Sequence, residues 1–209
     1  MSHLALLGDS IFDNAAYVAD GPAVIDQVNR RIPDGWRASL LAVDGDTTLD
    51  VPQQLTAMPL DVTHLVLSVG GNDALGCMPR LEAKATSVKQ GLVVLTQIKM
   101  EFEANYQRLI SRLVALNRPL MVCTIYDQVP GLVAELRTAL GMFNDVILRE
   151  SVRRALPVLD LRMICTEPDD YSDISPIEPS AKGGEKLTSK LIAAVLKHDF
   201  SEGECRVYS

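Results

Sequence analysis

Five continuous runs of apolar residues recur along the chain. They cover residues 4–7, 38–43, 65–69, 120–125 and 158–161. A strand with one face in water alternates apolar and polar residues, whereas a continuous run is typical of a strand that is covered on both faces. The pattern therefore predicts five parallel strands buried between two layers of helices.

Segments with helical periodicity separate these runs. We expect helices over residues 13–31, 51–58, 90–116, 133–156 and 180–197, with a break near Gly141. Alternating strands and helices predict an α/β fold in which helices cover both faces of an open parallel sheet. The sequence contains no repeat and no linker, so residues 1–209 are expected to form one domain with a frayed tail at about 199–209.

Charge and composition narrow the range of partners. The chain has 209 residues, a net charge of −7 and 47% hydrophobic residues, which is typical of a soluble globular protein. An acidic surface repels phosphate groups, so neither nucleic acid nor a membrane is an expected partner. No apolar run approaches the roughly 20 residues that span a bilayer. The first residues enter a strand without a signal-peptide core, which predicts a cytoplasmic protein.

The four cysteines do not form a metal-binding pattern. Cys77, Cys123, Cys165 and Cys205 include no C-x-x-C pair, and their spacing matches no zinc motif. Cys123 lies within an apolar run, which predicts a buried, reduced thiol. We therefore expect neither a metal nor a cofactor.

Polar motifs follow the first three predicted strands. Gly8-Asp9-Ser10 follows the first strand, Gly45 the second, and Gly70-Gly71-Asn72-Asp73 the third. Ligands of such sheets bind at the carboxyl ends of the strands, so these loops are expected to converge on one site. A serine in a strand-to-helix turn is a candidate nucleophile, but it can equally cap the next helix. The glycine and the asparagine can likewise be ordinary turn residues.

In order and spacing these motifs resemble the GDSL, or SGNH, family of serine hydrolases. The resemblance implies a flavodoxin-like three-layer α/β/α fold with a five-stranded sheet in the order 2-1-3-4-5, and an esterase or lipase activity without a metal. It implies that Ser10 is the nucleophile. It also implies an oxyanion hole made by the backbone N–H groups of Ser10 and Gly45 and the side-chain amide of Asn72, in which each donor can contribute about 3–4 kcal/mol. Asp9 and Asp73 are expected to brace the turns.

The sequence departs from the family pattern in two places. Ile11 replaces the leucine of the first motif, and the last motif lacks its histidine. When the chain is aligned on the Pro-Ser and Gly residues near the final helix, Glu178 stands at the histidine position. Ser175 stands at the aspartate position, and Asp173 precedes it by two residues. The partner that supports Glu178 is therefore open between Asp173, Ser175 and none.

The three histidines are expected to lie far from this site. His3 and His64 begin the first and third strands, which at about 3.3 Å per residue places them about 20 Å from the carboxyl edge. His198 follows the last helix and lies about 20 Å beyond its start. A general base must come within about 3 Å of the hydroxyl group that it deprotonates, so none of the three histidines fits this role.

Glu178 is left as the candidate general base. A carboxylate with a pKa near 4.3 is a poor base for serine, but burial can raise that pKa. The alternative is that Glu178 caps the last helix. The leading hypothesis is a serine hydrolase that cleaves a small-molecule carboxylic ester. The second is a catalytically impaired relative that binds an acylated or anionic small ligand. A flavin or phosphate binder is disfavoured because the chain lacks a Gly-rich phosphate loop.

Three apolar stripes can line an acyl pocket or simply belong to the core. They cover residues 75–78, 92–95 and 132–143. Because the sequence shows no long lid, a short acyl chain or an acetylated small molecule is the expected substrate.

Overall fold

A computed structural model describes residues 1–19 and 21–209. Its centre is a single parallel sheet with the strand order β2-β1-β3-β4-β5-β6. The strands are β1 (Ser2–Gly8), β2 (Trp36–Leu40), β3 (His64–Ser68), β4 (Leu120–Cys123), β5 (Val158–Leu159) and β6 (Val207–Tyr208). The predicted order of the first five strands is confirmed. The prediction of a frayed tail is wrong, because residues 207–208 add a sixth strand beside β5.

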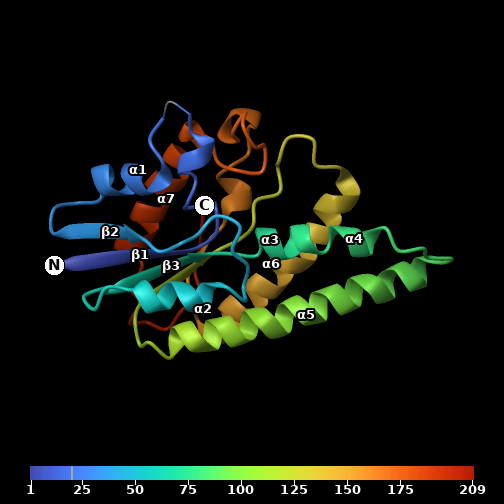
Figure 1. Ribbon diagram of the computed structural model, residues 1–209. Coiled ribbons are helices and arrows are strands. Elements are labelled where there is room, and N and C mark those ends of the chain that lie inside the picture. Colours follow the sequence, from blue (N-terminus) through green and yellow to red (C-terminus); the bar gives the residue numbers. More distant parts are fainter. Residues whose placement is uncertain (20) are drawn as a thin grey trace.

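Helices cover both faces of the sheet (Figure 1). The helices α1 and α7 lie on one face, and α2, α5 and α6 lie on the other. The helices are α1 (Val24–Arg31), α2 (Val51–Gln54), α3 (Gly71–Gly76), α4 (Met78–Leu81), α5 (Val88–Val114), α6 (Ala134–Arg154) and α7 (Ala181–Lys197). The structure is thus the expected three-layer α/β/α fold.

Strand β1 shows why its apolar run is continuous. Leu4 and Leu6 pack in the core cluster that includes residues of α1 and α7. Ala5 and Leu7 point the other way, into the cluster formed with α5 and α6. Successive side chains of a strand alternate between faces, so a strand between two helical layers must be apolar at every position.

Two helix predictions need correction. The expected helix over residues 13–31 is limited to α1, and only a 3₁₀ turn over Ala15–Tyr17 forms before it. Pro22 precedes α1, and the residue before a proline is disfavoured in helical backbone. Residue 20 of the expected helix lies outside the described residues. The expected break at Gly141 does not occur, since α6 runs through it from Ala134 to Arg154.

A helical extension projects beyond the carboxyl edge of the sheet (Figure 1). It consists of α3, α4, the first turns of α5 and the first turns of α6. The sequence pattern did not predict α3 or α4, because both helices are too short to show an apolar period. This extension borders the site described below.

No helix of the described chain is both long enough and apolar enough to span a bilayer. The four cysteines are free, and Cys123 is buried as expected. Burial raises the pKa of the Cys123 thiol far above its ordinary value, so it remains protonated.

Gly8 ends β1 where the backbone comes unusually close to β3. It has a φ of +124°, and a Cβ atom at this position would lie 1.7 Å from the carbonyl oxygen of Ser68. The buried side chain of Gln54 also binds Gly8. It accepts the Gly8 N–H at 2.9 Å and donates to the Gly8 carbonyl at 2.6 Å. Glycine is required here for both space and backbone conformation.

Replacing Gly8 with alanine should therefore severely destabilise the fold. The clash involves backbone that cannot rotate away, so we expect Gly8→Ala to lower the free energy of unfolding by about 4 kcal/mol or more. Chemical denaturation followed by circular dichroism measures this loss.

Gly70→Ala is a matched control, because Gly70 has nearly the same φ of +125° but would meet only side-chain ends, at 3.0 Å and beyond. It should cost about 1–3 kcal/mol. Equal losses in the two variants would show that the approach to Ser68 is unimportant.

Candidate active site

Ser10 lies at the carboxyl edge of the sheet, two residues after β1 ends. Its side chain is only 5% exposed and lines a cavity that Asn72 and Glu178 also line. Within the described chain, the backbone N–H of Ser10 donates to no backbone or side-chain acceptor. The serine thus lines the cavity and carries an N–H group that has no acceptor among the described residues.

Asn72 lies in the first turn of α3, which follows the neighbouring strand β3. Gly70, with its positive φ, precedes α3 and lets the chain turn directly from β3 into that helix. The Asn72 side-chain Nδ2 donates to the carbonyl of Asp46 at 3.0 Å. A carboxamide carries two N–H donors, so one remains for a ligand in the cavity.

Gly45 lies next to this contact, since Asp46 is the following residue. Its φ is +85°, and no atom lies within 4 Å of the place where a Cβ would stand. Among the described residues its N–H has no acceptor. The loop that carries Gly45 thus lies beside Asn72. Gly45 itself does not reach the cavity wall, whereas Ser10, Asn72 and Glu178 do.

Glu178 sits on the loop before α7, and several hydrogen bonds fix this loop. The backbone N–H of Ser172 donates to the Glu178 carbonyl at 2.8 Å. The Tyr126 hydroxyl donates to the carbonyl of Ile177 at 2.5 Å. The side-chain amide of Asn14 donates to the carbonyl of Pro179 at 3.1 Å. Contacts on both sides of Glu178 therefore hold its backbone in place.

The Glu178 carboxyl is 5% exposed, and its Oε2 atom has no hydrogen-bond partner among the described residues. Burial raises its pKa to about 7, the nearby Ser10 hydroxyl lowers it, and the negative charge of Asp44 raises it further. The contact with Ser10 does not reach strict hydrogen-bond geometry, which is common for such pairs before substrate binds. A carboxylate with a pKa close to neutrality is suited to accept a proton from a hydroxyl group.

Two more carboxyl groups lie close to these residues. Asp9 is buried, accepts the N–H of Ile11 at 3.2 Å and has its pKa raised to about 8, mainly by burial. It is therefore mostly protonated at neutral pH. Asp73 accepts the N–H of Thr48 at 3.0 Å and its hydroxyl at 2.6 Å, which ties α3 to the loop that carries Gly45.

Neither Asp173 nor Ser175 supports Glu178 through its side chain. Asp173 is exposed to solvent, and Ser175 contributes only its backbone carbonyl, which accepts the Glu178 N–H at 3.0 Å. The sequence left the supporting partner of Glu178 open between Asp173, Ser175 and none. Among the described residues, neither of these two side chains supports Glu178.

The histidines cluster at the opposite edge of the sheet. His3 contacts Asp61 at 3.1 Å and Ser39 at 2.8 Å. His64 and His198 both pack against the ring of Phe200. His3 and His64 stand at the amino ends of β1 and β3, while Ser10 follows the carboxyl end of β1. None of the three histidines lines the cavity.

The remaining wall of the cavity is apolar and comes from the helical extension. Its volume is about 180 Å³. Leu75, Met78 and Leu81 line it from α3 and α4, whereas Leu136 and Leu140 line it from α6. Two of the three predicted stripes, 75–78 and 132–143, thus contribute to it. The third, 92–95, does not, and α5 contributes Ile98 instead.

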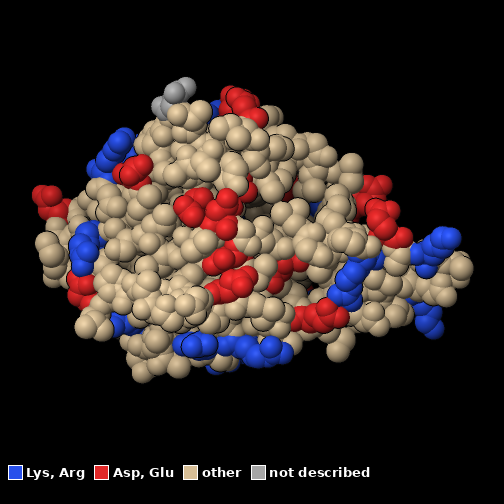
Figure 2. Space-filling view, in the orientation of Figure 1, with Lys and Arg blue, Asp and Glu red and all other residues tan. Residues whose placement is uncertain are grey.

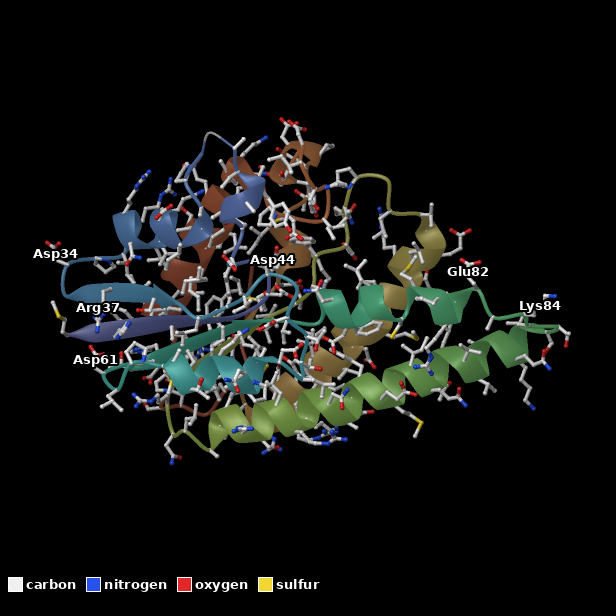
Figure 3. The ribbon with its side chains drawn as sticks, viewed as in Figure 1. Asp34, Arg37, Asp44, Asp61, Glu82 and Lys84 are labelled. Atoms are coloured by element: carbon white, nitrogen blue, oxygen red, sulfur yellow. The ribbon has the colours of Figure 1, made fainter. Side chains whose placement is uncertain are left out.

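Acidic side chains crowd the surface near this site. Figure 2 shows a band of them across the middle of the molecule, and Asp44 lies in this region (Figure 3). The side chain of Asp13 accepts the N–H of Asp44 at 3.0 Å, and Asp46 accepts from Gln54 at 2.7 Å. Such a rim favours neutral or cationic ligands over anionic ones.

Several residues that fix the site could not be found by motif reasoning. Gln54 joins the end of β1 to the Gly45 loop, and Asn14 joins the N-terminal loop to the Glu178 loop. Tyr126 holds Ile177. Each of the three residues binds a partner far along the chain, 46 residues away for Gln54 and Gly8, 165 for Asn14 and Pro179, and 51 for Tyr126 and Ile177, so no local pattern marks them.

Comparisons with known proteins identify the family and agree with the fold. A sequence profile of the GDSL-like Lipase/Acylhydrolase family matches residues 6–186. A search of curated proteins by sequence gave no significant match. The fold is similar to that of the lipase Lip_vut3 from a goat rumen metagenome, with a TM-score of 0.72 and 17% identity over 93% of this chain and 97% of that one.

Two other solved structures are similar to the same extent. The lipase/acylhydrolase from Enterococcus faecalis has a TM-score of 0.67 and 21% identity, covering 93% of this chain and 95% of that one. The psychrotrophic esterase EstA from Pseudoalteromonas sp. has a TM-score of 0.67 and 15% identity, covering 94% and 98%. The fold and the family profile together place this protein among ester hydrolases built on a parallel three-layer sheet. The chain belongs to the GDSL-like lipase/acylhydrolase family.

Removing the charge of Asp44 should lower the pKa of Glu178. Without this neighbouring negative charge the ionised form of Glu178 costs less, so Asp44→Asn should move the midpoint of its titration to lower pH by about 0.5. Nuclear magnetic resonance of ¹³C-labelled glutamate measures the midpoint directly.

Asp34→Asn is the control, because it removes the same charge at the far left of Figure 3. This variant should leave the midpoint in place. An equal shift in both variants would show that Asp44 acts only through net charge.

Proposed function

We propose that this protein is a serine ester hydrolase in which Ser10 is the nucleophile and Glu178 is the general base. The observation that carries this proposal is the shared cavity of Ser10, Asn72 and Glu178, with a buried carboxyl group against the serine. The substrate is a small-molecule carboxylic ester, and the reaction needs no metal or cofactor in this scheme.

The first half of the reaction forms an acyl-enzyme. Glu178 accepts the proton of the Ser10 hydroxyl while Oγ bonds to the ester carbonyl carbon, and the carbonyl electron pair moves onto its oxygen. When this intermediate collapses, the bond to the alcohol oxygen breaks and Glu178 returns the proton to the leaving alcohol. Water then repeats the sequence and releases the acid.

The charge on the intermediate is stabilised by hydrogen-bond donors. The free N–H of Ser10, the free N–H of Gly45 and the second N–H of the Asn72 amide are the available groups. Asp73 ties the helix that carries Asn72 to the loop that carries Gly45, and Gln54 ties that loop to the end of β1. Donors fixed in this way need no reorganisation when the charge develops.

A carboxylate can replace a histidine only if its pKa approaches the working pH. At its ordinary pKa of 4.5 Glu178 would be ionised but weakly basic, whereas a pKa of about 7 combines ionisation with useful basicity. Burial among apolar residues supplies this change, as it does for other catalytic carboxyl groups. The activity should therefore rise as the pH increases through about 7.

Substitution of the two central residues tests this mechanism. Ser10→Ala and Glu178→Gln should each reduce kcat for p-nitrophenyl esters by about 10³-fold or more, with the far-ultraviolet circular dichroism spectrum unchanged. A fluorophosphonate probe should label Ser10 in the unmodified protein, at a rate that rises through pH 7. Glu178→Gln should slow this labelling, because the variant cannot take up the proton.

Glu82→Gln provides a matched control, since Glu82 is exposed on the helical extension and does not line the cavity. It should keep full activity. A fully active Glu178→Gln variant would remove Glu178 from the mechanism. If no ester is hydrolysed and no probe is bound at any pH, the protein is instead a relative that binds an acylated ligand without turning it over.

A further inference from the structure

We propose that this hydrolase prefers esters whose alcohol carries a positive charge, such as a quaternary or protonated amino alcohol. The residues that select this charge are the carboxylates of an acidic rim beside Ser10, formed by Asp13, Asp44 and Asp46. The inference rests on the proposed ester hydrolase function and names the class of alcohol that this function would release.

Hydrogen bonds place the acidic rim next to the groups that react. Asp13 belongs to the loop that carries Ser10, and its carboxylate accepts the N–H of Asp44 at 3.0 Å. The backbone carbonyl of Asp46 accepts the side-chain amide of Asn72 at 3.0 Å. The rim therefore borders both the nucleophile and a donor of the proposed oxyanion hole.

Tyr17 joins Asp44 to the loop that carries Glu178. Its hydroxyl donates to the Asp44 carboxylate at 2.7 Å, and its carbonyl accepts the Ser172 hydroxyl at 2.6 Å. The N–H of Ser172 in turn donates to the carbonyl of Glu178 at 2.8 Å. The hydrogen bond to Asp44, above all, raises the pKa of the Tyr17 hydroxyl to about 12. The charges of Glu178 and Asp13 add to this rise, so these carboxyl groups lie close to the same hydroxyl.

The acidic rim differs from other acidic groups of this protein in its lack of a basic partner. Elsewhere Asp61, Asp145 and Glu150 each contact a Lys, Arg or His side chain. In the part of the chain that the structure describes, neither Glu178 nor any carboxylate of the rim forms such an ion pair. Figure 2 shows the resulting acidic band across the middle of the molecule. Negative charges gathered without a counterion attract a positively charged ligand.

A buried carboxyl group in the cavity points to the same kind of ligand. Glu178 is 5% exposed and lines the cavity with Ser10, and its Oε2 atom has no hydrogen-bond partner among the described residues. A buried carboxylate without a partner is costly, and a nearby positive charge stabilises its ionised form. The side chains that α4 and α6 present to the cavity are apolar and cannot supply this charge. An ammonium group on the alcohol supplies it from the side of the acidic rim.

Two esters that differ only in this charge test the inference. Acetylcholine carries a trimethylammonium group, and neohexyl acetate replaces its nitrogen with carbon at nearly the same shape. The neutral ester is the more hydrophobic of the two, so a site without charge recognition would prefer it. We expect kcat/KM, measured by acid release in a pH-stat, to be at least about tenfold higher for acetylcholine at low ionic strength. The ratio should fall towards one in about 0.5 M sodium chloride, because salt screens the rim.

Substitutions in the acidic rim should remove this preference. Asp44→Asn and Asp13→Asn should each lower the kcat/KM ratio of the two esters about threefold or more, and the double variant should bring the ratio to one or below. The ratio is informative because any change in the pKa of Glu178 affects both esters alike. Asp44→Glu keeps the charge and should keep the preference.

Asp34→Asn is again the matched control, because it removes one negative charge far from the site (Figure 3). It should leave the ratio of the two esters unchanged. The inference is overturned if neohexyl acetate is hydrolysed as well as acetylcholine, or if Asp34→Asn lowers the ratio as much as Asp44→Asn does.

Binding to the Ser10→Ala variant separates this inference from the proposed chemistry. Titration followed by nuclear magnetic resonance should show that acetylcholine binds this variant at least about fivefold more tightly than neohexyl acetate, and that adding Asp44→Asn removes most of the difference. Selective binding of acetylcholine without turnover of any ester by the unmodified protein would reject the hydrolase function and keep the charge preference. Turnover of both esters with no difference in binding would reject the charge preference and keep the hydrolase.

Discussion

The close approach of Gly8 to the carbonyl of Ser68 is the contact on which the site depends. Because of this contact the carboxyl ends of β1 and β3 lie side by side. The segments that follow the two strands therefore carry Ser10 and Asn72 to the same cavity. Gln54 completes the junction by binding both backbone groups of Gly8 and the side chain of Asp46. A side chain at position 8 would separate the two strands, and the polar groups of the site would no longer share one space.

Two buried carboxyl groups in the site also lower the stability of the folded state. Burial raises the pKa of Asp9 to about 8 and that of Glu178 to about 7, both above the values of an unfolded chain. Between about pH 4 and pH 8 the folded protein therefore binds more protons than the unfolded protein, and its stability falls as the pH rises through this range. The same desolvation makes Glu178 basic enough to act at neutral pH, so this cost and the proposed chemistry have one physical origin.

The two halves of the site come from different parts of the architecture. The loops at the carboxyl edge of the sheet supply the serine and the glutamate. The first turn of α3 supplies the amide of Asn72, and the rest of the helical extension supplies an apolar wall. The sheet is rigid because two helical layers cover it, which holds the reacting groups in place. The extension lies mostly beyond the edge of the sheet (Figure 1), and Ala74, Cys77 and Leu81 anchor it to the core.

The sequence by itself determined the first five strands and the glycine-rich loops that follow them, because these signals are local: an unbroken apolar run marks a covered strand, and a glycine marks a turn. It also indicated that the three histidines lie at the far edge of the sheet. Only the tertiary structure decided that Val207–Tyr208 forms a sixth strand, since a segment of two strand-favouring residues is too short to show a pattern and pairs only because β5 offers it a free edge. Likewise the environment of Glu178 and the cavity beside it depend on segments distant in sequence, whose packing no local pattern encodes.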